Sequence, residues 1–101
     1  MPTQPFIILL DRGFADDLVV IRVDGREVAR RERVTTNLMR GYADSVAIDL
    51  SGEPSSIEVA LPDRGLATTI QPPTPLPRYL AVDLRNGDLH YRFSDEPFGY
   101  L

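Results

Sequence analysis

The single histidine of this chain, His90, is the residue best suited to acid–base chemistry. It follows the dipeptide Asn86-Gly87, which is typical of a two-residue β-hairpin turn. Counting outward from this turn places His90 opposite Asp83, and a carboxylate that orients an imidazole is the arrangement of a general base. The arrangement is compatible with a hydrolase that uses His90 and Asp83, but we favour the alternative, a solvated cross-strand ion pair. Because no Gly-x-Ser-x-Gly nucleophile motif occurs, we assign no catalytic residue and expect no enzymatic activity.

Arginine residues are concentrated between positions 21 and 40. This segment carries six arginines and three acidic residues, so it is basic within a chain whose net charge is −4. Guanidinium groups bind phosphates and carboxylates in a bidentate manner, which predicts an anion-binding surface; the alternative is a solvated sheet edge. Strand alternation puts Arg26 and Arg30 on one face of the strand, and Arg31 and Arg33 on the other. The possible anion-binding residues are Arg26, Arg30, Arg31 and Arg33.

Three acidic residues, Asp11, Asp16 and Asp17, lie close together around Gly13. Their oxygens could bind a hard cation, but the spacing matches no EF-hand loop, and local hydrogen bonding in a turn is the alternative. The chain has no Cys and one His, so sites built from sulfur or nitrogen ligands are excluded. We therefore predict no metal and no cofactor.

Short β-strands are predicted to position these residues. Alternating apolar and polar residues between turns indicate eight strands, at residues 4–10, 17–23, 26–34, 43–50, 56–61, 66–71, 78–85 and 88–94. Residues 35–42 are predicted to form a loop, and the proline-rich residues 72–77 a crossover between sheets. The predicted fold class is all-β: an antiparallel β-sandwich of seven to eight short strands, prealbumin-like or immunoglobulin-like, or a small barrel. We expect residues 1–101 to form one domain with a short aromatic tail at residues 95–101.

Two turns fix strand register in this prediction. The Asp24-Gly25 turn pairs Ile21 with Val28 and Val20 with Ala29, and it makes the charged returning strand an edge. The Asn86-Gly87 turn gathers the apolar residues of both its strands on one face, namely Leu80, Val82, Leu84, Leu89, Tyr91 and Phe93.

Two apolar segments are candidate contact surfaces. Residues 6–10 are apolar on both faces, so we expect them to be covered twice, by a loop or by a neighbouring chain. Three of the last four residues are large and apolar, and we expect them to fold back over the sandwich or to dock into another chain. The predicted partner-binding residues are Phe6, Ile8, Leu10, Phe98, Tyr100 and Leu101.

Residues 23–28 (Val-Asp-Gly-Arg-Glu-Val), followed by residues 56–61 (Ser-Ile-Glu-Val-Ala-Leu), resemble PEGA-type and related prealbumin-like modules. In those modules a strand, a DG turn and a returning strand precede a strand of alternating apolar residues. The chain departs from their pattern because it lacks the Gly-His pair before the later strand and the Gly-Tyr pair after it. The resemblance implies a seven- or eight-strand antiparallel sandwich that acts as a non-catalytic binding or spacer module, and it carries over no site residue.

The function predicted first is a non-catalytic protein-interaction or assembly module, acting on a protein partner or by self-association. The alternatives are a carrier that holds a small apolar ligand between its sheets, and the hydrolase. The acidic charge balance, with a pI near 4.8, argues against a nucleic-acid partner. The longest apolar run, residues 6–10, is too short for a membrane span or a signal peptide, so we expect a cytoplasmic protein.

Overall fold

The computed structural model describes residues 5–37, 39, 41–50 and 52–97. It contains β1 (Phe6–Leu10), β2 (Asp17–Val23), β3 (Arg26–Val34), β4 (Asp44–Ile48), β5 (Ile57–Leu61), the 3-10 turn η1 (Pro62–Arg64), β6 (Leu66–Ile70), β7 (Tyr79–Arg85) and β8 (Asp88–Ser94). All eight strands were predicted, with the same bounds for β2, β3 and β8. The described residues of the predicted loop, 35–37, 39, 41 and 42, lie between β3 and β4, and Asn37 and Tyr42 form an isolated bridge.

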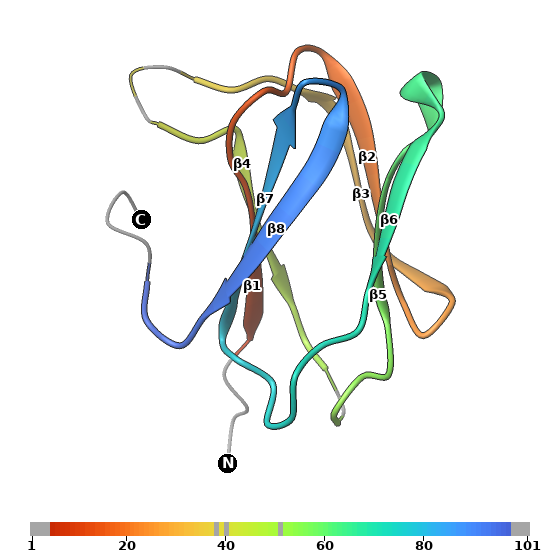
Figure 1. Cartoon of the computed structure of the whole chain (residues 1–101), viewed down its shortest axis with the longest axis vertical. Helices are drawn as coiled ribbons and strands as arrows, with labels where there is room; N and C mark the ends of the chain where they lie inside the picture. The colour runs from red at the N-terminus through yellow and green to blue at the C-terminus, as the bar shows by residue number, and fades with distance from the viewer. Residues whose placement is uncertain (1–4, 38, 40, 51, 98–101) are drawn as a thin grey trace.

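The strands form two four-stranded sheets that pack face to face (Figure 1). The first sheet has the order β4-β1-β7-β8, and the second has the order β3-β2-β5-β6. This arrangement confirms the β-sandwich, and the sheets do not close into a barrel. One neighbouring pair, β1 with β7, is parallel, and the others are antiparallel. The proline-rich segment crosses from β6 in the second sheet to β7 in the first, as predicted.

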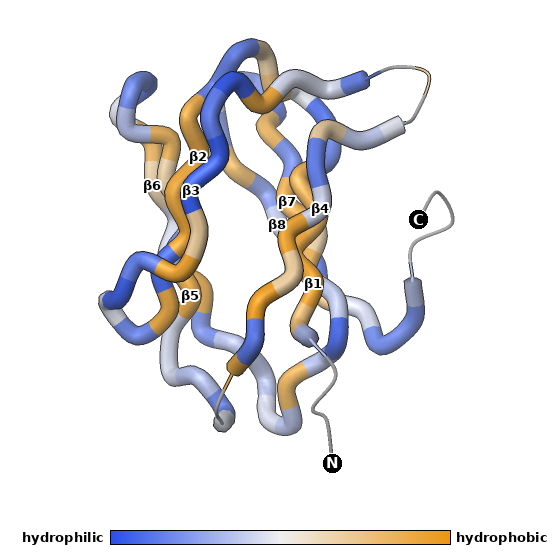
Figure 2. Tube along the Cα trace, turned by 180° about the vertical axis from the view of Figure 1, so that it is seen from behind, coloured by the Kyte–Doolittle hydropathy of each residue, from blue (hydrophilic) through white to orange (hydrophobic). Residues whose placement is uncertain are grey.

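Apolar side chains from both sheets meet between them and form the core. Figure 2 shows the contrast between the apolar tube along β1 and the hydrophilic stretches of β3. The largest fully buried side chains of this core are Ile8, Leu10, Ile21, Ile57, Leu61, Ile70 and Leu80. Burial of such side chains contributes about 1.5–3 kcal/mol each, so they are the main source of stability of the sandwich.

Strand β1 lies inside its sheet, between β4 and β7. Its residues Phe6, Ile8 and Leu10 are 4%, 0% and 0% exposed and belong to the core cluster. A side chain that is covered by its own chain is unavailable to a second protein. The interpretation of these three residues as partner-binding residues is therefore corrected: their apolar character serves the interior.

The β7–β8 hairpin has the predicted register along its whole length, from Arg85 opposite Asp88 to Tyr79 opposite Ser94. Both turn residues, Asn86 and Gly87, have positive φ, as a type I′ turn requires. Alternation then turns the apolar residues of both strands toward the second sheet.

The β2–β3 hairpin departs from the predicted register. After the pairs Val23–Arg26 and Arg22–Glu27, Ile21 lies opposite Ala29 rather than Val28, because a β-bulge leaves Val28 unpaired. A second irregularity follows between Asp17 and Val19. The predicted pairs Ile21–Val28 and Val20–Ala29 are therefore wrong, since an inserted residue shifts every later pair by one. The prediction that β3 is an edge strand is confirmed.

Candidate functional site

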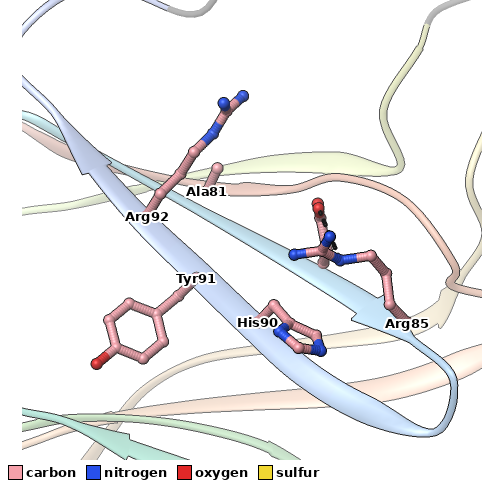
Figure 3. A pocket seen from close by; sticks show the side chains of 6 residues that line it. Ala81, Arg85, His90, Tyr91 and Arg92 are labelled. Carbon is pink, nitrogen blue, oxygen red and sulfur yellow. Dashed lines mark ion pairs between the residues drawn. The ribbon is translucent and has the colours of Figure 1, made fainter.

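A small pocket of about 90 Å³ lies on the outer face of the β7–β8 hairpin. It is lined by Ala81, Asp83, Arg85, His90, Tyr91 and Arg92 (Figure 3). Asp83 lies opposite His90 in the hairpin register, as predicted from the turn. The sequence therefore located this pair correctly.

The contacts inside this pocket do not form a general base. No hydrogen bond joins His90 to Asp83 in the described structure; instead, Asp83 Oδ2 lies 3.8 Å from Arg85 Nε, and Arg85 curves back toward the carboxylate in Figure 3. The other carboxylate oxygen, Oδ1, is buried without a hydrogen-bond partner among the described residues. The six residues that line the pocket include no Ser or Thr, so the arrangement supplies a charged surface rather than a nucleophile beside a base.

The bulges of β3 distribute its arginines over different places. Arg26 lies opposite Val23, which packs against the core, whereas Arg30 lies opposite Val20 on the outer face. The expectation that Arg26 and Arg30 share a face is therefore corrected, because the inserted Val28 inverts the alternation between them.

Two of these arginines already form ion pairs. Arg30 pairs with Glu27 at 2.9 Å, and Arg31 reaches across the sandwich to Asp44 of β4 at 3.5 Å. The hydrogen bond from Arg30 holds the pKa of Glu27 below its ordinary value. Arg33 lies farther along β3, beside the acidic residues of a separate hollow, and Arg26 lies near the hairpin tip. The four candidate anion-binding residues are thus not brought together.

The acidic turn after β1 is held by local hydrogen bonds and by an arginine. Asp17 is 5% exposed; its Oδ2 accepts a hydrogen bond from Ala15 N at 2.8 Å, and its carboxylate pairs with Arg64 of η1. Donation to Asp17 raises the pKa of Arg64. The described residues contain no group of three or more His, Cys, Asp or Glu that could hold a metal ion. The turn interpretation thus has direct structural support in this part of the chain, and sequence reasoning missed the contribution of Arg64.

The hollows bordered by described residues open to solvent. One of them, about 500 Å³, lies at one end of the sandwich and is lined by Arg12, Gly13, Phe14, Thr36 and Gly41. Core side chains occupy the space between the sheets. A carrier would therefore have to use an open hollow of this kind rather than an enclosed space between the sheets.

The outer edge of β8 is a further surface. In the described structure β8 pairs with β7 alone, and this pairing runs through all seven residues without a bulge. Leu89 and Phe93 pack against the core, while Tyr91 is 48% exposed and meets the ring of Phe93 edge-to-face at 6.1 Å. In Figure 3, Tyr91 points away from the side of the strand that carries Arg92. A regular edge strand presents unpaired backbone groups that can pair with another chain, and aromatic residues are enriched at protein interfaces.

The hydrogen bonds between β7 and the residues that follow β1 determine which backbone groups of β8 face outward. Val82 O accepts from Asp11 N, and Leu84 N donates to Arg12 O, both at 2.8 Å. The even-numbered residues of β7 therefore direct their backbone groups toward β1, and the odd-numbered ones toward β8. Through the register, the even-numbered residues of β8 bond to β7, which leaves the N–H and C=O groups of Leu89, Tyr91 and Phe93 directed at the free edge.

The remaining predicted partner-binding residues, Phe98, Tyr100 and Leu101, lie outside the described residues. In the described part of the chain, no helix is both long enough and apolar enough to cross a membrane.

Comparison of the chain with protein-family models, with curated proteins and with solved structures finds no match. The geometry of the edges and pockets is therefore the basis for assigning a function.

Proposed function

We propose that this chain is a non-catalytic β-sandwich module that binds extended polypeptide segments by strand addition at the free edge of β8. The observation that carries the proposal is the regular seven-residue edge, with its outward backbone groups and the half-exposed ring of Tyr91. An added strand would satisfy those backbone groups, while its alternate side chains would meet the apolar face of β8.

Comparison of the four sheet edges supports the choice of β8. Proteins protect exposed edges with bulges, charges and short strands. On β3 the pairing is interrupted twice and six of nine residues are charged; β4 and β6 each have five residues. In β8 the charged residues Asp88 and Arg92 alternate with apolar ones, so the face turned toward the second sheet carries no charge. This edge is thus the least protected of the four.

Selection of random twelve-residue peptides against the full chain tests this proposal. Enriched peptides should be extended and should alternate apolar with polar residues. Their affinity is then measured by fluorescence anisotropy with Tyr91→Ala and Tyr91→Pro. Both variants lose the aromatic ring, but only the proline variant also loses the backbone N–H of residue 91. This N–H points outward and makes no bond to β7, so the β7–β8 pairing is kept.

We expect Tyr91→Pro to bind at least about tenfold more weakly than Tyr91→Ala, because a hydrogen bond is lost and the pyrrolidine ring obstructs the incoming strand. Circular dichroism of both variants is the control that checks whether they fold. If the two bind the peptides equally well, the partner does not pair with the backbone of β8, and the proposal is wrong.

A further inference from the structure

We infer that the edge of β8 pairs with β8 of a second copy of this chain, joining the two first sheets into one continuous eight-stranded sheet. This inference rests on the proposed function and names one partner for that edge. It follows from the self-complementarity of β8, which the next three observations establish.

The first observation is which residues of β8 direct their backbone N–H and C=O groups at the free edge. An antiparallel strand pairs with its own copy about a two-fold axis only if outward-directed residues meet outward-directed residues. Leu89, Tyr91 and Phe93 are the outward-directed residues of β8, and Tyr91 is the midpoint of Asp88–Ser94. With Tyr91 opposite Tyr91 of the second copy, the two strands overlap over their full length. This register allows about six backbone hydrogen bonds between the copies.

The second observation concerns the apolar face. In this register Leu89 lies opposite Phe93 of the second copy, and the two Tyr91 rings become neighbours. Cross-strand aromatic pairs and pairs of aromatic with aliphatic side chains stabilise sheets. The ring of Tyr91, 48% exposed in the isolated chain, would be covered by the second copy.

The third observation concerns the charged face. Asp88 lies opposite Ser94 of the second copy, and His90 lies opposite Arg92. No two carboxylates and no two guanidinium groups are opposed in this register, although each chain carries a net charge of −4. The register therefore avoids the repulsion that like charges would cause directly across the strands.

The ends of β8 also fit a two-stranded contact. Beyond the strand, Ser94 Oγ donates to Glu96 O at 2.7 Å and accepts from Glu96 N at 3.1 Å, which closes a local turn before Pro97. The pairing thus ends where the hairpin turn of the second copy begins. Once both β8 edges are used the contact is closed, and the short edges β4 and β6 and the bulged edge β3 remain to face solvent. A closed dimer results rather than a filament.

The contact area of two edge strands is smaller than the roughly 1,200–2,000 Å² of a stable interface, so we expect a dissociation constant on the order of 10–100 µM. Sedimentation velocity of the full chain between about 5 and 500 µM should show a monomer that shifts to a dimer within that range. Hydrogen exchange followed by NMR should show that the amides of Leu89, Tyr91 and Phe93 gain protection as concentration rises. The amides of His90 and Arg92, bonded to β7, should be protected throughout.

Two variants with the same charge change locate the contact. Tyr91→Lys introduces a charge among the side chains of β8 that face the second sheet, and we expect this variant to remain monomeric up to the highest concentration. Val28→Lys changes a 37%-exposed apolar residue of the β3 edge and should dimerise like the unmodified chain. The exchange pattern of the unmodified chain tests the inference even if a variant fails to fold.

A chain that stays monomeric at about 500 µM, or a dimer that persists in Tyr91→Lys, overturns the inference. The proposed function has a separate outcome. If the chain stays monomeric but binds the selected peptides, and Tyr91→Pro weakens that binding, strand addition at β8 is supported and only the pairing with a second copy is ruled out.

Discussion

Replacement of Gly13 by alanine should destabilise this protein far more than the same replacement in an open turn. Gly13 has φ +92°, and an added Cβ would overlap the carbonyl oxygen of Leu84. Gly87 has a similar φ, +81°, but an added Cβ would have no neighbour within 4 Å. Comparison of the two alanine variants therefore separates the cost of the backbone conformation from the cost of the steric overlap with Leu84.

The conformational cost is shared by both variants. Positive φ costs a non-glycine residue about 1–2 kcal/mol, and the lower entropy of the unfolded chain offsets about 0.4–1 kcal/mol of this. Gly87→Ala should therefore lower the free energy of unfolding by about 1 kcal/mol.

Gly13→Ala must in addition move the loop away from Leu84. This movement weakens the 2.8 Å hydrogen bond from Leu84 N to Arg12 O and partly uncovers Phe14, which is 3% exposed. We expect a total loss of about 3–4 kcal/mol, of which the backbone conformation supplies about 1, the hydrogen bond about 1 and the packing the remainder.

Urea denaturation measures the difference. The chain has four Tyr and no Trp, so tyrosine fluorescence and far-UV circular dichroism report unfolding. Free energies of unfolding that agree within about 0.5 kcal/mol for the two variants would show that the loop yields easily, and the reasoning from close approach would be refuted.

Two further predictions concern β3. Arg33 has φ +57°, and Arg33→Gly should raise the free energy of unfolding by about 0.5–1 kcal/mol because glycine adopts this conformation freely; Arg31→Gly is the matched control, and urea denaturation should show it less stable than the unmodified chain. Because the pKa of Glu27 is lowered in the folded chain, its pair with Arg30 stabilises the fold above the unfolded pKa, and this contribution is lost as pH falls through the folded pKa. NMR titration of Glu27 should show a midpoint below the ordinary value, which Arg30→Gln should restore; an unchanged midpoint in that variant would contradict this cause.

Features encoded within a few neighbouring residues were read correctly from the sequence. Asn86-Gly87 supplies two adjacent positions of positive φ, and the alternation on both sides of it agrees with the same register. Turn and pattern reinforce each other there, so a slip of one residue would turn the apolar face outward. The eight strands and the edge position of β3 follow from the same local rules.

The β2–β3 hairpin shows where this reasoning fails. Its turn, Asp24-Gly25, is as clear as the other, yet Val28 is left out of the pairing. The residues of β3 are mostly charged, so no apolar alternation resists a bulge. The prediction that Arg26 and Arg30 share a face was consequently wrong, because Val28 inverts the alternation between them.

The sequence by itself determined the strands, the two turns and the all-β class, because propensity, turn conformation and alternation act over short distances along the chain. The tertiary structure decided which segments became neighbours: β1 beside β7, Asp17 with Arg64 across 47 positions, and β8 at an edge that faces solvent. These features depend on how two sheets share one core, and packing between distant segments leaves no local pattern. The candidate interaction surface belongs to this second group, because β8, unlike the highly charged β3, carries no sequence pattern that marks it as an edge.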